Sequence, residues 1–231
     1  MHPSRIFELL EPFLDSASKR RLTADDLQRI STYIDILQRW NARINLTAIR
    51  DEEDIVTRHF GESLFAARIL FPLCPSVPPV VKGVEVADVG SGAGFPGIPI
   101  KLWAPEVSLT LIESNQKKAT FLKEVTRALT LTDVNIQTTR AESLAGASFA
   151  VVTLRAVEHF DSILPVAANL VAPGGRLALL IGQTQLPRAQ SALPALNWST
   201  PIAIPSSQTR VFAIACNLLS ACRELQHAPR K

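Results

Sequence analysis

The sequence is poor in cysteine, and its basic and acidic residues nearly balance. Its three cysteines, Cys74, Cys216 and Cys222, include no C-x-x-C pair, so it predicts neither a disulfide framework nor a structural zinc site. That pattern fits a reducing compartment. The 24 Lys and Arg exceed the 21 Asp and Glu by only 3, too little for overall charge to indicate nucleic-acid binding. A nucleic-acid partner would need a local basic patch.

Long apolar runs are also missing. Charged residues interrupt the first fifteen positions, so no signal-peptide core is predicted there. No later apolar run approaches the roughly 18 residues that a membrane-spanning helix requires. We therefore expect a cytoplasmic, monomeric protein without a membrane partner.

The first seventy residues show helical patterns. Thr23 and the two aspartates after it fit a helix start, and apolar residues then recur every three or four positions to about Trp40. A second start signal stands at Asp51, where four acidic residues precede a long apolar pattern. Residues 1–70 are thus predicted to form a helical N-terminal cap.

Four prolines between positions 71 and 80 predict a linker over 71–82. Beyond it, residues 83–231 alternate short apolar runs with helical segments, which predicts an α/β fold: a doubly wound, mainly parallel sheet of the Rossmann-like class. The expected strands are Val84–Val89, Ser108–Ile112, Val134–Gln137, Phe149–Leu154, Arg176–Ile181 and a closing hairpin strand at Val211–Ala215, and the expected helices lie near 97–104, 115–129 and 159–171.

A glycine-rich turn directly follows the first predicted strand. Gly90, Gly92 and Gly94 permit unusual backbone angles and let a ligand lie against the main chain. Together with Gly97, the last two also satisfy the G-x-G-x-x-G spacing of dinucleotide sites, so the glycines alone leave nicotinamide and S-adenosylmethionine cofactors open. Glu113, at the end of the next strand, suits ribose hydroxyls in either case.

Three further features favour S-adenosylmethionine. Asp88 precedes the first glycine by two residues, where a carboxylate would face the ammonium or sulfonium charge of that cofactor. The segment around Glu142 follows a third strand, where methyltransferases usually bind adenine. The Pro-Gly-Gly turn before the fifth strand is common in class I methyltransferases, a point of analogy.

The chain also resembles a known family, the bacterial small-subunit ribosomal RNA guanine-N7 methyltransferases, called glucose-inhibited division protein B. The matching segments keep their order across roughly residues 40–185. They are Trp40–Thr47, Arg58-His59, Glu62–Leu64, Asp88–Ile98, Glu113, Lys117-Lys118 and Leu154–Ala156. This resemblance implies methyl transfer from S-adenosylmethionine to N7 of a guanine in 16S ribosomal RNA, with that RNA or the small ribosomal subunit as partner.

The resemblance also implies cofactor-binding residues. They are Gly90, Gly92, Phe95, Glu113, Ser114, Asn115, Ala141, Glu142 and Arg155, to which the glycine turn itself adds Asp88 and Gly94. Two positions depart from the family pattern. Ile181 stands where relatives usually carry a lysine, and Glu62 stands where they carry Asp.

Guanine N7 needs no general base, because its lone pair is unprotonated at neutral pH. Alignment of the reactants is then the main requirement, and Arg155 is assigned an orienting role rather than a catalytic one. We interpret His59 as structural for the same reason. Amino-group methylation usually accompanies an Asn/Asp-Pro-Pro-aromatic motif, which is missing, and carbon-5 methylation needs a cysteine nucleophile that no cysteine here is placed to supply.

RNA contacts are predicted at four residues. Lys117 and Lys118 begin a predicted helix, where positive charge opposes the helix dipole unless a phosphate is bound. Arg58 and Asn45 lie in the cap near the expected site. The residues leave three alternatives: a methyltransferase for a small molecule, a non-catalytic cofactor-binding regulator, and an NAD(P)-dependent dehydrogenase.

Overall fold

The structure is a computed structural model that describes residues 1–14, 22–72, 83–144, 146–157 and 159–217. Most of the predicted linker over 71–82 lies outside these ranges, as do Cys74 and Cys222. Cys216 is a half-buried thiol that forms no disulfide. The division into an N-terminal cap, a linker and a cofactor-binding domain therefore stays a prediction.

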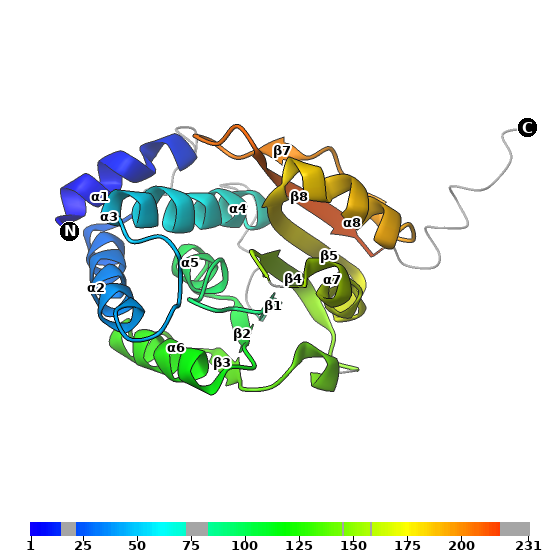
Figure 1. Ribbon diagram of the computed structural model, residues 1–231, viewed down its shortest axis with the longest axis horizontal. Helices are drawn as coiled ribbons and strands as arrows, with labels where there is room; N and C mark the ends of the chain where they lie inside the picture. The colour runs from blue at the N-terminus through cyan, green and yellow to red at the C-terminus, as the bar shows by residue number, and fades with distance from the viewer. Residues whose placement is uncertain (15–21, 73–82, 145, 158, 218–231) are drawn as a thin grey trace, which may run out of the picture.

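One mixed sheet runs through the molecule (Figure 1). Its strands are β1 (Glu85–Val89), β2 (Ser108–Ile112), β3 (Val134–Gln137), β4 (Phe149–Arg155), β5 (Val171–Gly182), β6 (Asn197–Trp198), β7 (Ile202–Ala203) and β8 (Arg210–Cys216). The order is β3-β2-β1-β4-β5-β8-β6, with β7 beside β8. Strands β1 to β5 pair in parallel, and β8 is antiparallel to β5. The predicted doubly wound fold and its closing antiparallel strand are confirmed.

The N-terminal residues are helical as predicted. They form α1 (Pro3–Leu10), η1 (Glu11–Phe13), α2 (Ala24–Asn41), α3 (Glu52–Asp54), η2 (Ile55–Gly61) and α4 (Glu62–Leu70). Thr23 caps α2 in a reciprocal arrangement, since its hydroxyl accepts from the N–H of Asp26 while its own N–H donates to the Asp26 carboxylate. Asp51 caps α3 through one such bond, since its carboxylate accepts from the N–H of Asp54. The segment η2 is π-helical, whereas the apolar pattern predicted a regular helix there.

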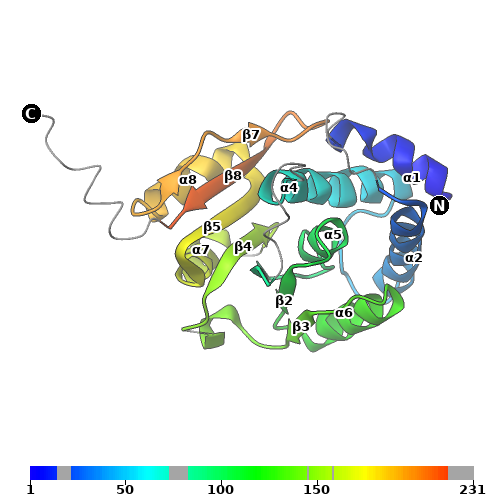
Figure 2. The ribbon, with the colours of Figure 1, turned by 180° about the vertical axis from the view of Figure 1, so that it is seen from behind.

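These helices share a core with one face of the sheet. The first hydrophobic cluster joins Ile6, Tyr33 and Phe60 of the N-terminal helices to Ile98 and Leu111 of the cofactor-binding half. Helices α5 (Gly97–Trp103) and α6 (Gln116–Ala128) complete this layer, and Figure 2 shows α2 and α6 side by side. A hydrogen bond of 2.8 Å from Trp40 Nε1 to the Glu124 carboxylate links these two helices.

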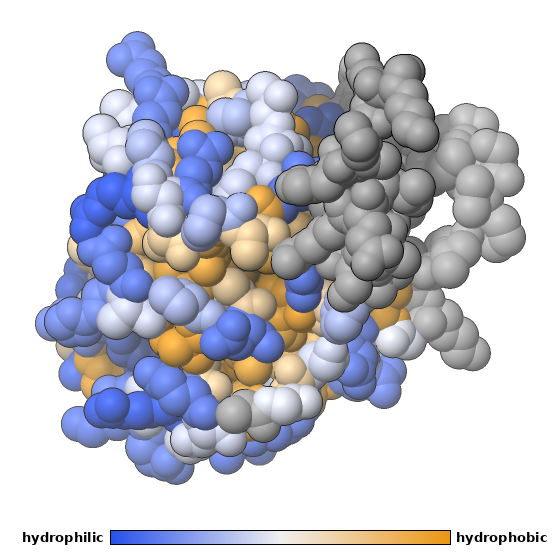
Figure 3. All heavy atoms as spheres, turned by 90° about the vertical axis from the view of Figure 1, so that its right-hand side faces the viewer, coloured by the Kyte–Doolittle hydropathy of each residue, from blue (hydrophilic) through white to orange (hydrophobic). Residues whose placement is uncertain are grey.

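The other face of the sheet is covered by η3 (Ala141–Leu144), α7 (Phe160–Asn169), η4 (Gln183–Gln185) and α8 (Leu186–Ala192). A second cluster fills this side, with an outer layer of partly buried side chains such as Ile163 and Leu186. Viewed from the side of α7 and α8, apolar residues are visible between hydrophilic ones (Figure 3). Among the residues that the structure describes, no helix is long and apolar enough to cross a membrane.

Candidate active site

A cleft of about 1290 Å³ opens at the carboxyl ends of β1, β2 and β4. Loop residues 45–50, between α2 and α3, also line it, together with Arg58 and His59 of η2. Five residues that follow β4 also line it, as do residues 139–142 after β3 and Arg210 of β8; the five are Ala156, Val157, His159, Ser162 and Ile163. Single ligand sites usually measure about 300–1,000 Å³, so the cleft has room for more than one small ligand.

The glycine turn forms part of the cleft floor. The N–H groups of Gly90 and Ser91 both donate to the carbonyl of Ile112, which ties the turn to the end of β2. Gly92 has a φ of +54°, and a Cβ placed on it would meet only the Gly90 carbonyl oxygen, at 3.7 Å. The space above Gly92 is therefore left open by the protein.

Glu113 is held in place by main-chain donors. One carboxylate oxygen accepts from Gly92 N–H at 2.9 Å and the other from Asn115 N–H at 2.7 Å. Each carboxylate oxygen has a further lone pair, so the group still has acceptor capacity. Asn115 in turn caps α6, since its side-chain oxygen accepts from the N–H groups of Lys117 and Lys118.

Asp88 lies beneath the turn instead of facing a ligand. Its carboxylate is 1% exposed, accepts from the Thr153 hydroxyl at 2.8 Å and from Gly97 N–H at 3.2 Å, and does not line the cleft. Burial raises its pKa to about 6 although these hydrogen bonds oppose the shift. The expectation that Asp88 faces the cofactor is wrong, because the carboxylate is bonded to Thr153 of β4 and to the N–H of Gly97 instead.

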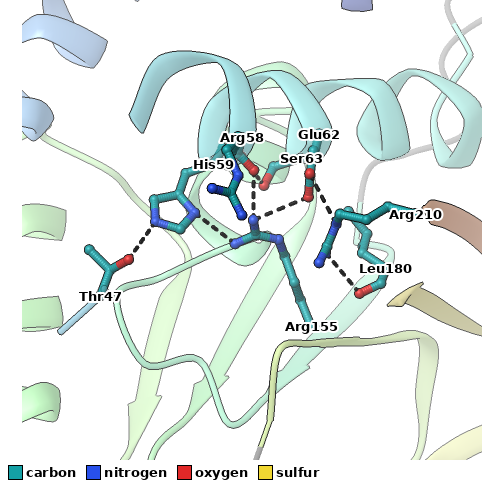
Figure 4. A network of polar contacts seen from close by, with 8 residues as sticks. All are labelled: Thr47, Arg58, His59, Glu62, Ser63, Arg155, Leu180 and Arg210. Atoms are coloured by element: carbon teal, nitrogen blue, oxygen red, sulfur yellow. Dashed lines mark hydrogen bonds and ion pairs between the residues drawn. The ribbon is translucent and has the colours of Figure 1, made fainter. Parts of the chain in front are cut away.

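Arg155, at the end of β4, contacts one short stretch of the N-terminal helices (Figure 4). Its Nη2 donates to the Arg58 carbonyl at 2.6 Å and to Glu62 at 3.2 Å, and its Nη1 contacts His59 Nδ1 at 2.9 Å. Glu62 also pairs with Arg210 Nε at 3.0 Å, and Arg210 donates to the Leu180 carbonyl. One buried carboxylate thus joins two arginines from different strands to α4.

His59 is neutral and fully hydrogen-bonded. Burial and the charges of Arg155, Arg58 and Arg210 lower its pKa from 6.5 to about 2. A guanidinium only donates, so His59 Nδ1 accepts from Arg155 and the proton stands on Nε2, which contacts the Thr47 hydroxyl at 2.8 Å. Neither ring nitrogen is left to take a proton from a substrate, in agreement with the structural role predicted for His59.

Comparison with known proteins decides the family. The family model of the rRNA small subunit methyltransferase G proteins (GidB) matches residues 26–197. A ribosomal RNA small subunit methyltransferase G from Halorhodospira halophila is 41% identical over 162 residues, which cover 70% of this chain and 72% of that protein. One from Stenotrophomonas maltophilia (strain K279a) is 35% identical over 208 residues, or 88% of this chain and 91% of that protein.

The chain belongs to the rRNA small subunit methyltransferase G family. Its fold agrees with that assignment. A methyltransferase from Aquifex aeolicus has a TM-score of 0.56 at 13% identity, covering 81% of this chain and 98% of that one. A ribosomal protein L11 methylase from Lactobacillus delbrueckii has a TM-score of 0.55 at 18% identity, covering 69% and 78%. Of the two cofactor classes that the glycines left open, membership of this family selects S-adenosylmethionine.

The structure brings most of the predicted site residues of this family member to the cleft. Those that line it are Gly90, Gly92, Phe95, Glu113, Ser114, Asn115, Ala141, Glu142, Arg155, Asn45, Arg58 and Lys118. Phe95 stacks between His59 and Tyr33, with ring centroids 4.7 and 5.3 Å away. Gly94 and Lys117 do not line the cleft. Gly94 is enclosed by Tyr33, Ile98 and Leu122, and Lys117 is exposed on the first turn of α6.

Several residues of the cleft are not among the predicted site residues. Arg50, Arg140, Val157 and Arg210 line the cleft, and a Cβ on Gly90 would collide with Val157 at 2.8 Å. Arg210 is the first residue of the closing strand β8. The residues that it approaches follow from the pairing of β8 with β5, which the sequence alone does not reveal. Ile181, at the position of the family lysine, is 3% exposed and belongs to the second core cluster.

The neutral state of His59 predicts how stability depends on pH. Below its unfolded-state pKa of 6.5, the unfolded imidazole binds a proton that the folded one does not, so stability falls as pH falls, by up to about 1.4 kcal/mol per pH unit. Asp88 changes the stability with pH in the opposite direction. Its folded-state pKa is raised to about 6, so its contribution increases as pH falls through that value.

Urea unfolding at about pH 7.5 and about pH 6 samples mainly the His59 contribution, because Asp88 titrates at the lower edge of that window. His59→Gln, which has no ionisable group, should lose less stability than the wild type between these two pH values. Equal losses in both proteins would show that His59 takes up a proton in the folded state.

Proposed function

We propose that this protein transfers a methyl group from S-adenosylmethionine to N7 of a guanine in small-subunit (16S) ribosomal RNA. Family membership supports the reaction class, and the charge of the cleft supports the substrate. Six basic side chains line the cleft against two carboxylates. They are Arg50, Arg58, Lys118, Arg140, Arg155 and Arg210, and the carboxylates are Glu113 and Glu142.

This excess of positive charge is the observation that favours RNA over a small neutral acceptor. Phosphates carry one negative charge each, and arginine binds them through two donors at once. Arg58, Arg140 and Arg50 are exposed, so their guanidinium groups are accessible to a polynucleotide. Arg155 and Arg210 already share the Glu62 carboxylate, so a small neutral metabolite would leave the other four cationic side chains facing only Glu113 and Glu142.

The floor of the cleft fits S-adenosylmethionine. The open space above Gly92 is what a closely bound ligand requires, and the Glu113 carboxylate beside it suits the two hydroxyls of a ribose. The loop around Ala141 and Glu142 lines the same end of the cleft and would hold the adenine. We assign the cofactor to this side, which leaves the side of Asn45 and Arg58 for the acceptor base.

The cofactor supplies an electrophilic methyl group on a positively charged sulfur. The protein's contribution is to hold guanine N7 in line with that methyl group and to exclude water, effects worth up to about 7–11 kcal/mol in favourable cases. No proton leaves N7, so the mechanism requires no base. Both ring nitrogens of His59 are already hydrogen-bonded within the protein, so His59 is not available as a base, which agrees with this mechanism.

A single-turnover transfer assay tests the proposal. Purified protein and labelled S-adenosylmethionine are mixed with small-subunit RNA, or with small subunits, that lack N7-methylguanosine. We expect the label in N7-methylguanosine, with a rate that falls steeply as salt rises, because phosphate contacts are screened. Label in a different nucleoside, or none in RNA while the cofactor still binds, would contradict the proposal.

The cofactor side has its own test. Glu113→Gln replaces one of two accepting oxygens by a donor that opposes Gly92 N–H or Asn115 N–H, so affinity for S-adenosylmethionine should fall about tenfold or more in calorimetric titration. Glu85→Gln is the matched control, since Glu85 is exposed at the opposite end of the sheet and should bind the cofactor like the wild type.

A further inference from the structure

The loop between α2 and α3 presents Asn45 to the cleft. The N–H of Leu46 donates to the carbonyl of Ile44 at 2.8 Å, so the chain turns sharply with Asn45 as the central residue. Its side chain is exposed and lines the cleft.

Hydrogen bonds of a buried side chain stabilise this turn. The buried Asn41 side-chain oxygen accepts from the N–H groups of Leu46 and Thr47 at 3.0 and 3.1 Å, and its Nδ2 donates to the Thr47 carbonyl at 3.0 Å. Thr47 is joined to His59 through its hydroxyl. Asn45 therefore lies on a loop that hydrogen bonds within the protein hold in place.

Arg50 determines which way the Asn45 amide faces. Its Nη1 donates to the Asn41 carbonyl at 2.7 Å, and its Nη2 donates to Asn45 Oδ1 at 3.2 Å. Because a guanidinium has donors only, the atom it contacts must be the amide oxygen. The NH₂ group of Asn45 is left for a ligand, and within the described ranges it has no hydrogen-bond acceptor.

The other neutral polar groups of the cleft are less suited to recognise a base by hydrogen bonding. The hydroxyls of Ser91 and Ser162 already donate to the carbonyls of Asp88 and His159. Ser114 and Asn115 follow Glu113 directly, and Thr139 precedes Ala141, all on the side that we assign to the cofactor. The Thr47 hydroxyl is already bonded to His59 and to the N–H of Ile49. Asn45 is on the opposite side, where the acceptor base has to enter.

Guanine presents two acceptors on the edge that is methylated, O6 and N7, whereas adenine presents N7 beside an amino donor. A neutral NH₂ can bind O6 without placing a full positive charge against N7, which becomes cationic on methylation. An unrestrained carboxamide could rotate by half a turn and accept from adenine. The contact with Arg50 opposes that rotation, because it would bring two donors together.

We propose that Asn45 is a specificity-determining residue that recognises O6 of the target guanine through its amide NH₂. Arg50 is its positioning residue and keeps the amide in the donating orientation. This inference rests on the proposed function, since it concerns the base that enters the same cleft. It assigns to Asn45 and Arg50 the distinction between guanine and a base with an amino group at position 6.

Four RNA substrates test the inference, each carrying a different base at the position that the transfer assay identifies. The bases are guanine, hypoxanthine, 2-aminopurine, which lacks O6, and 2,6-diaminopurine, which has an amino group there. Single-turnover rates are measured for the wild type, Asn45→Ala and Arg50→Lys. Since N7 reactivity differs between bases, the ratio of variant to wild type is compared for each base.

Asn45→Ala should slow transfer to guanine and hypoxanthine about tenfold, as for one lost hydrogen bond, and leave transfer to 2-aminopurine unchanged. Arg50→Lys keeps the charge but cannot hold both acceptors, so it should reduce the preference for guanine over 2,6-diaminopurine, a ratio that a weaker phosphate contact alone would not change. Arg29→Lys, on an exposed turn of α2 paired with Asp25, is the matched control and should change neither quantity.

Equal slowing of all four bases by Asn45→Ala would overturn the inference, because it would show a role that does not involve O6. An unchanged base preference in Arg50→Lys would overturn the positioning role of Arg50. A wild-type protein that methylates no guanine in the RNA would overturn the proposed function, and this inference with it. Transfer to guanine by the wild type separates the two failures.

Discussion

Glu62→Ala is expected to lower the free energy of unfolding by about 3–5 kcal/mol, the usual cost of removing one partner from a buried ion pair. The Glu62 side chain is 4% exposed and pairs with Arg155 and Arg210, whose side chains are 7% and 24% exposed. Its removal leaves two guanidinium groups facing one another in a site largely closed to water. The partial exposure of Arg210 favours the lower end of that range.

Urea unfolding at neutral pH measures the effect. Glu53→Ala provides the matched control, because Glu53 pairs with Arg5 on the surface, where both side chains are about half exposed, and should cost less than about 1 kcal/mol. Glu62→Gln keeps the size and one accepting oxygen and should fall between the two. A loss in Glu62→Ala as small as that in Glu53→Ala would mean that water reaches the two arginines.

Gly94→Ala is expected to destabilise the protein by about 3 kcal/mol. Gly94 has a φ of +84°, where a residue with a Cβ costs about 1–2 kcal/mol. The added Cβ would also lie 2.7 Å from Ile98 Cδ1 and against the Tyr33 hydroxyl, which donates to the Ala93 carbonyl. Overpacking of this kind typically adds about 1–3 kcal/mol.

Gly92→Ala is the matched variant, because its φ of +54° imposes a similar backbone cost while its Cβ meets no protein atom closer than 3.7 Å. We expect a loss of only about 1–2 kcal/mol in stability, together with weaker binding of S-adenosylmethionine, since the methyl group enters the open space of the cleft. Unfolding and cofactor titration on both variants separate the two roles. If Gly94→Ala and Gly92→Ala lost the same stability, close packing would not be the reason that position 94 requires a glycine.

Several elements were predictable because their causes are local. The capping of α2 by Thr23 joins residues three positions apart, and strands β2 and β3 have the limits expected from short apolar runs. Glu113, at the end of β2, was found in the same way, since the carboxyl ends of parallel strands meet at one edge of a sheet.

Other features depend on which segments meet. The segment η2 is π-helical, although its apolar spacing also suits an α-helix. Arg155 of β4 is hydrogen-bonded to two residues of η2, the carbonyl of Arg58 and the ring of His59. The strand β5 begins at Val171, earlier than the apolar run at Arg176 indicated, because Val171 pairs with Phe149 before the register shifts. Neither feature can be read from one segment alone.

The sequence by itself determined the order of the elements, the glycine turn, Glu113 and the family, since all of these follow from residue types at short spacing. Only the tertiary structure decided what the charged groups do. Glu62 and Arg155 are 93 positions apart, and Asp88 and Thr153 are 65 apart. Whether a carboxylate faces a ligand, a guanidinium or a hydroxyl depends on the distance and burial that packing creates, and spacing along the chain contains neither.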